Sequence, residues 1–313
     1  MTDPLHVAAA VIVRADGAVL LAQRPSGKPW AGYWEFPGGK LEPGESASEA
    51  LARELDEELG IRVRRAAPWL TQTFTYPHAT VLLEFFRVFA WDGDPVGRDG
   101  QAFAWQRPEA IEVSPLLPAN TRVIASLTLP PVYAITCAGD IGVPAMLERA
   151  ERALARGLRL VQLREKTWDA ARRASFGREL IALAHRHSAR VLLNGDATEA
   201  RALGADGVHW TSEALHRAGG RPADLVVAAS CHTRAELDRA AALEVDFAVL
   251  GPVRPTPSHP GAAPLGWDAF ARLVAGTRIP VYALGGLVPA DLDTAIAHGA
   301  HGVALRSAAW PAD

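Results

Sequence analysis

The chain has 313 residues, of which 49% are hydrophobic, and its formal net charge is −3. This length is enough for two domains with ordinary hydrophobic cores. The slightly acidic balance argues against broad nucleic-acid binding, which normally requires a basic surface.

Cysteine use and the N-terminal residues indicate where the protein works. Cys137 and Cys231 are too few for a disulfide framework and lack metal-ligand spacing, so we interpret them as small buried residues. The first residues, MTDPLHVAAAVIV, contain no positively charged leader, and no apolar run reaches membrane-spanning length. We therefore expect a soluble cytoplasmic protein with neither a membrane nor a nucleic acid as its partner.

The first part of the chain combines strands with two helices. Apolar runs separated by turn residues predict strands at 6–14, 18–23, 67–76 and 81–90. Helices are predicted at 45–59 and 119–127. Consecutive prolines at 130 and 131 end a helix and stiffen a linker, so we place one domain at 1–128 and a second at 131–313.

The second part repeats a short apolar strand followed by a helical stretch. Eight such strands are predicted, at 131–137, 158–165, 190–195, 207–210, 224–230, 246–253, 279–286 and 302–307. This repetition predicts parallel strands that close into a (β/α)₈ barrel, so the fold class is α/β. Few residues follow the eighth strand, and we expect another element, such as the helix at 119–127, to cover the gap.

Acidic side chains gather at residues 54–58. Glu54, Glu57 and Glu58 are three and four residues apart on the predicted helix, so we expect them to share one face. Converging carboxylates repel each other unless a cation lies among them, and oxygen ligands suit Mg²⁺ or Mn²⁺. The alternative is a solvated acidic helix face. Gly38 and Gly39 precede the helix in a predicted loop, where glycine allows backbone angles closed to other residues.

The spacing around these glutamates resembles the Nudix box, G-x5-E-x7-R-E-U-x-E-E-x-G-U, where U is aliphatic. Every defined position is filled, from Gly39 and Glu45 through Arg53 to Gly60 and Ile61. The resemblance covers about residues 5–128 and is greatest to the MutT-type 8-oxo-dGTP diphosphatases. It implies an α/β/α sandwich that uses Mg²⁺, or Mn²⁺, to hydrolyse a nucleoside triphosphate to its monophosphate and pyrophosphate.

The resemblance also implies a role for each residue of this site. The implied metal ligands are the Gly38 carbonyl, Glu54, Glu57, Glu58 and Asp99. Glu54 is the candidate for orienting or deprotonating the attacking water, and Glu58 is the candidate for the strongest ligand. Asp99 stands where the family usually has Glu, so we expect its shorter side chain to act through a water. We interpret Arg53 and Glu45 as an ion pair that holds the loop against the helix.

A further set of residues matches the family's nucleotide-binding positions: Arg24, Glu35, Phe36, Pro37, Gly38 and Asn120. An amide such as that of Asn120 can pair with a purine edge, or it can cap the helix that follows. Phe36 is either part of the core or a stacking surface for the base. Lys28 and Pro29 occupy the region where the family often has a His.

Polar and glycine-rich segments follow several predicted barrel strands, and in barrels this end carries the chemistry. The segments include QLREK (162–166), SCHT (230–233) and LGGL (284–287), and the series resembles the thiamine-phosphate synthase and TenI family over about residues 131–310. Gln162, Arg164 and Lys166 alternate along one strand, so they face one side and could hold a phosphate or pyrophosphate. The N–H groups of Gly285 and Gly286 could bind a phosphate.

The second part departs from the synthase pattern at its metal ligands. Gly195 follows Asn194, and Ala214 occupies a second position, where the synthases have Asp residues that help to hold Mg²⁺. His259 stands in place of the expected phosphate-loop Lys. TenI-like proteins lack that metal and act as thiazole tautomerases with a histidine, whose position His232 matches. A helix-entry residue without a catalytic role is the alternative for His232.

Three hypotheses follow. The first is an 8-oxo-dGTP diphosphatase whose activity resides in residues 1–128, beside a barrel that binds a phosphorylated thiazole or pyrimidine. The second is a broader Nudix hydrolase acting on a thiamine-related diphosphate, or a bifunctional enzyme whose barrel is a thiazole tautomerase or thiamine-phosphate synthase. The third is a thiamine-pathway barrel with a regulatory Nudix module, and the intact box argues against it.

Overall fold

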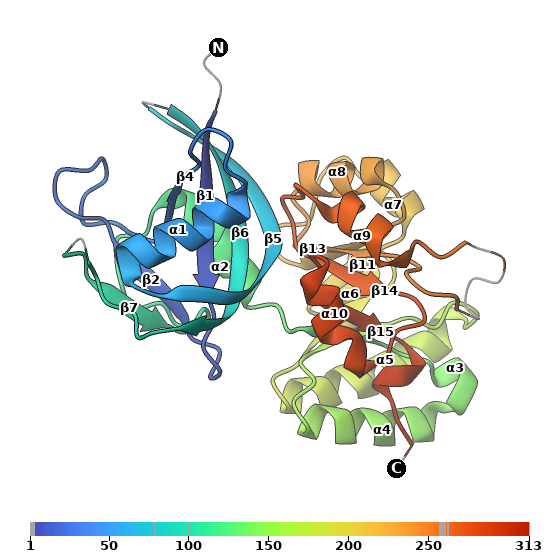
Figure 1. Cartoon of the computed structure of the whole chain (residues 1–313). Coiled ribbons are helices and arrows are strands. Elements are labelled where there is room, and N and C mark those ends of the chain that lie inside the picture. The colour runs from blue at the N-terminus through green and yellow to red at the C-terminus, as the bar shows by residue number, and fades with distance from the viewer. Residues whose placement is uncertain (1–3, 78, 99, 257–260, 262, 313) are drawn as a thin grey trace. The chain divides into compact units, whose positions relative to one another are not determined.

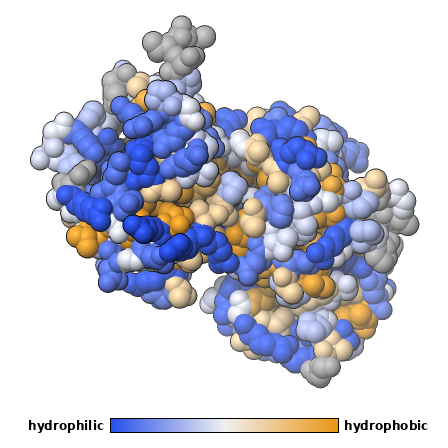
Figure 2. Space-filling model, viewed as in Figure 1, coloured by the Kyte–Doolittle hydropathy of each residue, from blue (hydrophilic) through white to orange (hydrophobic). Residues whose placement is uncertain are grey.

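The computed structural model describes residues 4–77, 79–98, 100–256, 261 and 263–312 (Figure 1). The chain divides between Thr128 and Leu129 into two compact units. Within the described ranges, no helix has a stretch long and apolar enough to pass through a lipid bilayer. Figure 2 shows a visible face of mostly hydrophilic residues with small apolar areas, as expected when the large apolar side chains fill interior cores.

The described residues of the first unit form two sheets and two helices. The four-stranded sheet has the order β4 (Gly38–Lys40), β1 (Leu5–Ile12), β6 (Ala79–Asp92) and β5 (Arg62–Tyr76). The three-stranded sheet has the order β3 (Trp34–Glu35), β2 (Val19–Gln23) and β7 (Phe103–Gln106). The helices are α1 (Ala47–Leu59) and α2 (Pro118–Leu127). This arrangement confirms the predicted α/β class of the first unit.

Strand β1 lies between two hydrophobic cores because successive residues of a strand point to opposite faces. Ala8, Ala10 and Ile12 pack with the apolar face of α1. Ala9 and Val11 pack on the other face, in a cluster that includes residues of α2. The two helices therefore cover opposite faces of the sheet at β1, which makes the layers an α/β/α sandwich.

Helix α1 begins and ends on specific caps. The Ser46 side chain accepts a hydrogen bond from the Glu49 backbone, and the Glu49 carboxylate binds the Ser46 N–H in return, which forms a capping box. Gly60 ends the helix with φ +70°, a conformation that favours glycine. The helix was predicted from residue 45 and begins at Ala47, because Ser46 is the cap.

The short strands of the first unit are the main difference from the sequence prediction. β3, β4 and β7 have two to four residues each, too few for an alternating pattern to show. Gly38 and Gly39, predicted in a loop, lie in β4 and pair antiparallel with β1. Strand β5 begins at Arg62 rather than residue 67, because exposed arginines mask its first half.

The second unit is the predicted barrel. Its eight parallel strands close in the order β10-β11-β12-β13-β14-β15-β8-β9. Their bounds are β8 (Val132–Ile135), β9 (Leu160–Leu163), β10 (Arg190–Leu193), β11 (Gly207–Trp210), β12 (Val226–Cys231), β13 (Phe247–Leu250), β14 (Val281–Leu284) and β15 (Gly302–Leu305).

Helices connect these strands around the outside of the barrel (Figure 1). They are α3 (Ala138–Ile141), α4 (Val143–Ala155), α5 (Ala170–Arg186), α6 (Ala197–Leu203), α7 (Ser212–Arg217), α8 (Arg234–Ala242), α9 (Gly266–Val274), α10 (Leu292–Ala297) and the 3₁₀ turns η1 (Pro289–Asp291) and η2 (Ser307–Ala309). Side chains such as Tyr133, Phe247 and Tyr282 fill the barrel interior.

The helix predicted at 119–127 is α2, which belongs to the first unit. Val123 and Ile124 of α2 pack in the core of the first unit. After β15 the chain forms η2, and the buried Trp310 donates its indole N–H to the Ile135 carbonyl at 2.7 Å. This tryptophan occupies the place that an eighth helix would otherwise cover.

Candidate functional site

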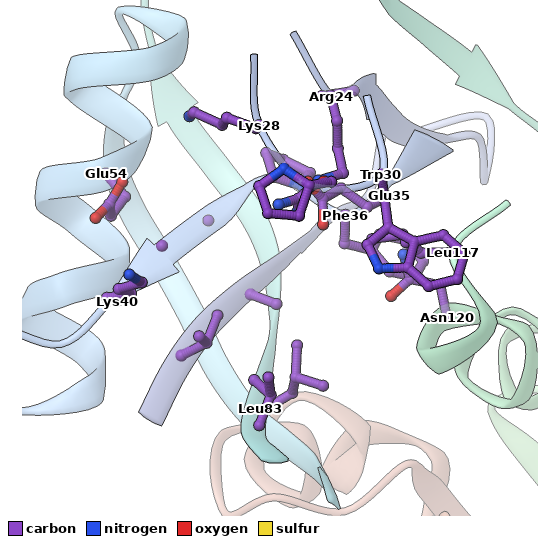
Figure 3. A pocket seen from close by; sticks show the side chains of 18 of the residues that line it. Arg24, Lys28, Trp30, Glu35, Phe36, Lys40, Glu54, Leu83, Leu117 and Asn120 are labelled. Carbon is purple, nitrogen blue, oxygen red and sulfur yellow. The ribbon is translucent and has the colours of Figure 1, made fainter. Parts of the chain in front are cut away.

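The first unit contains a cleft of about 660 Å³. Of the predicted site residues, it brings together Arg24, Glu35, Phe36, Pro37, Gly38, Glu54, Glu58 and Asn120. Figure 3 shows Glu54 and Lys40 at one end, and Trp30, Leu117 and Asn120 at the other. The cleft is therefore polar and charged at one end and largely apolar at the other.

The Glu54 carboxylate lies directly against the backbone of Gly39. A β-carbon at Gly39 would be 2.1 Å from the carboxylate carbon of Glu54, so only glycine leaves room for it. Arg53 donates from Nη1 to Glu54 Oε1 at 3.0 Å. The Glu54 carboxylate is therefore held against the Gly39 backbone, and it accepts a hydrogen bond from the charged Arg53 side chain.

Arg53 links the loop to the helix, as expected. Its Nε and Nη2 donate to the two oxygens of Glu45, each at 2.9 Å, and Nη2 also donates to the Lys40 carbonyl at 3.0 Å. These bonds lower the pKa of the Glu45 carboxyl. The predicted ion pair is present, and it fixes the chain that precedes α1.

The three glutamates were expected to share one face, and two of them line the cleft. Glu54 and Glu58 are one turn apart and line the cleft, whereas Glu57 does not line it. The Glu57 side chain is 62% exposed and lies 3.2 Å from Arg53 Nη1, the nitrogen that also donates to Glu54 Oε1. At about 100° per residue, position 57 is rotated away from position 58, and the i,i+4 contact with Arg53 stabilises it there.

The acidic end suits a magnesium ion that is shared with substrate phosphates. Among the described residues, no three His, Cys, Asp or Glu side chains group closely enough to hold a cation by themselves. Mg²⁺ is typically held by one or two carboxylates together with substrate phosphates, which is the set that Glu54 and Glu58 can supply. Lys28 Nζ lies 3.9 Å from Glu58 Oε1, so a cationic group already faces these carboxylates.

Asp99, the remaining predicted ligand, lies outside the described residues. The residues on either side of it lie at the C-terminal end of α1. The Arg98 N–H donates to the Glu58 carbonyl at 3.0 Å, and Gln101 Nε2 donates to the same carbonyl at 3.1 Å. Arg98 and Gln101 are thus attached to the helix turn that carries Glu58.

Asn120 is the most informative residue at the apolar end. It is 3% exposed, it lines the cleft, and its buried Nδ2 has no hydrogen-bond partner among the described residues. The helix-cap interpretation was wrong, because α2 begins at Pro118 and Leu117 is its N-cap. A buried amide without a partner is costly, so this donor indicates a ligand group that would accept from it.

Phe36 and the Arg24–Glu35 pair form the wall between the two ends. Phe36 is 3% exposed and packs edge-on against Phe85, so it belongs to the core while one edge lines the cleft. Arg24 Nη1 donates to Glu35 Oε1 at 2.6 Å, and Arg24 Nε donates to the Pro29 carbonyl at 2.8 Å. Burial raises the pKa of the Glu35 carboxyl, while the Arg24 charge acts in the opposite direction.

The second unit contains a cleft of about 610 Å³ at the carboxyl ends of the barrel strands. All its predicted residues line this cleft: Gln162, Arg164, Lys166, His232, Gly285 and Gly286. Both glycines have positive φ, and a β-carbon on either would meet the backbone of the preceding loop at 2.5–2.7 Å. These positions therefore require glycine, and they bring the chain close to the cleft.

The barrel cleft is cationic. Arg164, Lys166 and Arg306 line it, and Arg306 Nη1 pairs with Asp140 Oδ2 at 2.7 Å. Burial and the nearby Arg306 charge lower the pKa of Arg164, and the Arg164 charge lowers the pKa of Lys166. An anion in this cleft would relieve that repulsion. Arg306 directly follows β15 and belongs to none of the motifs named above, so the sequence did not indicate it.

The orientation of His232 suits a proton acceptor. Its Nδ1 lies 2.8 Å from the Gly251 carbonyl, which can only accept, so Nδ1 carries the proton and Nε2 is the basic nitrogen of the neutral ring. The adjacent backbone is fixed because the His232 N–H donates to the Glu236 carboxylate at 2.6 Å.

A buried polar network that reaches the lining of the barrel cleft was not predicted. Tyr133 Oη lies 3.1 Å from His209 Nδ1, and His209 Nε2 lies 2.8 Å from Ser230 Oγ. Burial lowers the pKa of His209 to about 3, so its ring is neutral at physiological pH. His209 lies within the motif ADGVHW, where strand periodicity alone cannot separate a core position from a site position.

Asp196 and Glu213 are the acidic residues next to the two positions that lack the synthase Asp, and both have other contacts. Asp196 accepts hydrogen bonds from the Thr198 and Glu199 N–H groups as the N-cap of α6, and it does not line the cleft. Glu213 lines the cleft but accepts from Arg217 Nη1 at 2.8 Å. The fit to a synthase-type metal site is therefore poor. His259 lies outside the described residues.

Two family models match the chain, and both agree with the geometry. A NUDIX domain matches residues 4–127, and thiamine monophosphate synthase matches residues 132–309. The 8-oxo-dGTP diphosphatase of Haemophilus influenzae is 38% identical over 123 residues, which are 39% of this chain and 90% of that protein. The 8-oxo-dGTP diphosphatase of Escherichia coli is 32% identical over 123 residues, 39% of this chain and 95% of that protein.

A similar match covers the second unit. The putative thiamine-phosphate synthase of Geobacter sulfurreducens is 40% identical over 181 residues, which are 56% of this chain and 85% of that protein. The two sets of relatives match different parts of the chain. The protein is therefore a member of both families, with a Nudix hydrolase domain followed by a barrel domain of the thiamine monophosphate synthase family.

Proposed function

We propose that the first unit hydrolyses nucleoside triphosphates to a monophosphate and pyrophosphate, with 8-oxo-dGTP as the preferred substrate. The observation that carries the proposal is the pairing of two features in one cleft. Glu54 and Glu58 lie at the polar end, and the Asn120 amide nitrogen, which has no hydrogen-bond partner in the described part of the chain, lies at the apolar end. A nucleotide has the matching polarity, since its phosphates suit the first end and its base suits the second.

The carboxylates have separate tasks in this proposal. When bound, Mg²⁺ would supply positive charge to the phosphates and lower the pKa of a water toward neutrality. Glu58 would be its principal protein ligand. Glu54, held against Gly39 and bonded to Arg53, would orient the attacking water or accept its proton.

The base contact predicts the effect of removing the Asn120 amide. We expect Asn120→Ala to reduce the preference for 8-oxo-dGTP over dGTP, measured as the ratio of kcat/KM values, by about tenfold. This factor corresponds to about 1.4 kcal/mol, which lies within the range for a buried hydrogen bond. The rate of monophosphate formation at saturating Mg²⁺, measured by chromatography, gives kcat/KM for each of the two substrates. The value for dGTP is the internal reference.

A substrate panel tests the proposal as a whole. The full-length protein is compared on 8-oxo-dGTP, dGTP and thiamine diphosphate. A preference for thiamine diphosphate would overturn the proposal and support the hydrolase of a thiamine-related diphosphate. An unchanged ratio in Asn120→Ala, with 8-oxo-dGTP still preferred, would keep the substrate and refute the role of Asn120.

We infer a second activity for the barrel, proton transfer on a phosphorylated thiazole. The orientation of His232 favours it, because Nε2 is the basic nitrogen of a ring that lines a cationic cleft. Arg164 and Lys166 would hold the anionic part of the ligand, and the loop at Gly285 and Gly286 would approach its phosphate. The poor fit of Asp196 and Glu213 to a metal site argues against thiamine-phosphate synthesis.

This inference predicts two results for the barrel. The protein should form no thiamine phosphate from the pyrimidine diphosphate and thiazole phosphate substrates of the synthases. The protein should catalyse exchange of a ring-adjacent proton of a thiazole phosphate with deuterated solvent, and NMR measures the rate of this exchange. His232→Ala should slow the exchange by about 10²-fold.

His187→Ala is the matched control. His187 lies in the same unit, pairs with Glu151 at 3.0 Å and does not line the cleft, so its loss should leave the exchange rate unchanged. Thiamine phosphate that forms with the wild-type protein and disappears in His232→Ala would show instead that the barrel is a synthase.

A further inference from the structure

Trp30 stands where the backbone favours a different residue. The Ala31 N–H donates to the Lys28 carbonyl at 3.1 Å and closes a turn whose central residues are Pro29 and Trp30. Proline fixes a negative φ, and Trp30 has a φ of +62°, which is the sign pattern of a type II turn. Glycine or asparagine normally occupies the second central position, because a bulky side chain there is strained.

Contacts hold the Trp30 indole over the cleft in spite of this strain. Its ring lies 4.9 Å from that of Tyr33, edge to face, and 5.7 Å from that of Tyr76. Arg24 Nε donates to the Pro29 carbonyl at 2.8 Å, and this hydrogen bond helps to fix the turn. The side chain is half-buried and lines the cleft, so the turn presents an aromatic surface to it.

The indole lies at the same end of the cleft as the unpartnered amide. Figure 3 shows Trp30, Leu117 and Asn120 toward the same end of the cleft, away from Glu54, and all three line it. Asn120 offers a donor to the edge of a base, but an edge contact alone leaves the faces of the base uncovered. Aromatic side chains bind bases through their faces, and the two rings of a purine overlap an indole more than the single ring of a pyrimidine does.

We propose that Trp30 covers one face of the base and thereby sets a preference for purine over pyrimidine nucleotides. The proposal rests on the proposed nucleotide hydrolysis and names the residue that selects the class of base. It also gives a reason for a tryptophan at a strained position, because strained residues that persist commonly serve a site.

Trp30→Gly separates this role from a structural one. Glycine suits the turn, so we expect the variant to unfold near the wild-type temperature. We expect its KM for 8-oxo-dGTP and its inhibition constant for 8-oxo-dGMP to rise about 10- to 100-fold, the range for loss of one stacked aromatic. Its kcat and its inhibition constant for inorganic pyrophosphate, which has no base, should stay within about threefold of wild type.

Trp30→Phe is the conservative variant, and it should keep the KM for 8-oxo-dGTP within about threefold of wild type because it keeps an aromatic face. The purine preference, measured as kcat/KM for 8-oxo-dGTP over that for dCTP, should fall in Trp30→Gly and persist in Trp30→Phe. A lower unfolding temperature in Trp30→Gly, with equal weakening of 8-oxo-dGMP and pyrophosphate, would show that the tryptophan only supports the loop.

The two proposals fail in different ways. If the wild-type protein hydrolyses 8-oxo-dGTP and Trp30→Gly has the same KM, only the role of Trp30 is refuted. If the wild-type protein neither hydrolyses a purine triphosphate nor binds 8-oxo-dGMP, both the nucleotide function and the role of Trp30 are refuted.

Discussion

Glu58→Gln should lower the turnover number of the first unit by more than about 10²-fold, because it removes a charge from the ion that stabilises the transition state. Glu58 lines the cleft beside Glu54, and the backbone of its helix turn receives hydrogen bonds from Arg98 and Gln101. Glutamine keeps the size of the side chain, so the fold should be preserved. Steady-state kinetics with 8-oxo-dGTP and a Mg²⁺ titration give kcat and the apparent metal affinity.

Glu57→Gln is the matched control, since it makes the same chemical change on the adjacent residue of the same helix. The Glu57 side chain is largely exposed and contacts Arg53 outside the cleft, so we expect kcat to fall by less than about tenfold. Equal losses in the two variants would mean that Glu57 turns into the cleft when substrate binds. Near-normal turnover in Glu58→Gln would refute the ligand assignment itself.

The contrast between these glutamates shows how far sequence reasoning reaches. The spacing placed Glu54 and Glu58 correctly on one side of a helix, because a helical period is a local property. It could not separate Glu57 from them, since the direction of that side chain depends on its contact with Arg53. Arg53 is in turn fixed by Glu45 and by the Lys40 carbonyl, which are distant in sequence from Glu57.

Asn120 illustrates the same limit at the other end of the cleft. The residue could be named from its motif, but a helix cap and a base contact were both open, because the sequence did not fix the first residue of α2. The structure excludes the cap, since Leu117 is the N-cap of α2, and it leaves the amide nitrogen of a cleft-lining residue without a partner among the described residues. Trp30 had no sequence signal, because its importance depends on a turn and on the distant Tyr76.

The barrel was predicted more completely than the first unit. Eight repeats of strand and helix define the closure, because each parallel strand needs a connecting helix and the repeat is visible in the sequence. The two-residue and three-residue strands of the first unit lack such a repeat, and β4 is formed largely by glycines. Its sequence therefore resembled a loop, although Gly38 pairs with Ala9 of β1.

Gly39 lies beside Gly38 in β4, and the second large effect is expected for Gly39→Ala. Its β-carbon would lie 2.1 Å from the Glu54 carboxylate carbon and from Oε1, so the carboxylate must move. The group that moves is the flexible end of a side chain, so the strand pairing should survive. We expect kcat for 8-oxo-dGTP to fall by more than about 10²-fold, the size of effect seen when one catalytic electrostatic group is lost. The unfolding temperature should stay close to wild type.

Two other glycines provide the controls for this prediction. Gly44 has a φ of +85°, and a β-carbon added there would have nothing within 4 Å, so Gly44→Ala should cost about 1–2 kcal/mol of stability and leave kcat unchanged. Gly38→Ala would put a β-carbon 2.1 Å from the Ala8 carbonyl oxygen, which is backbone, so it should destabilise the β1–β4 pairing itself. If Gly39→Ala lowers stability as much as Gly38→Ala does, its loss of activity results from disruption of the β1–β4 pairing rather than from movement of Glu54. If Gly39→Ala keeps near-normal turnover, Glu54 does not need to lie against the loop, and its role in positioning the water is refuted.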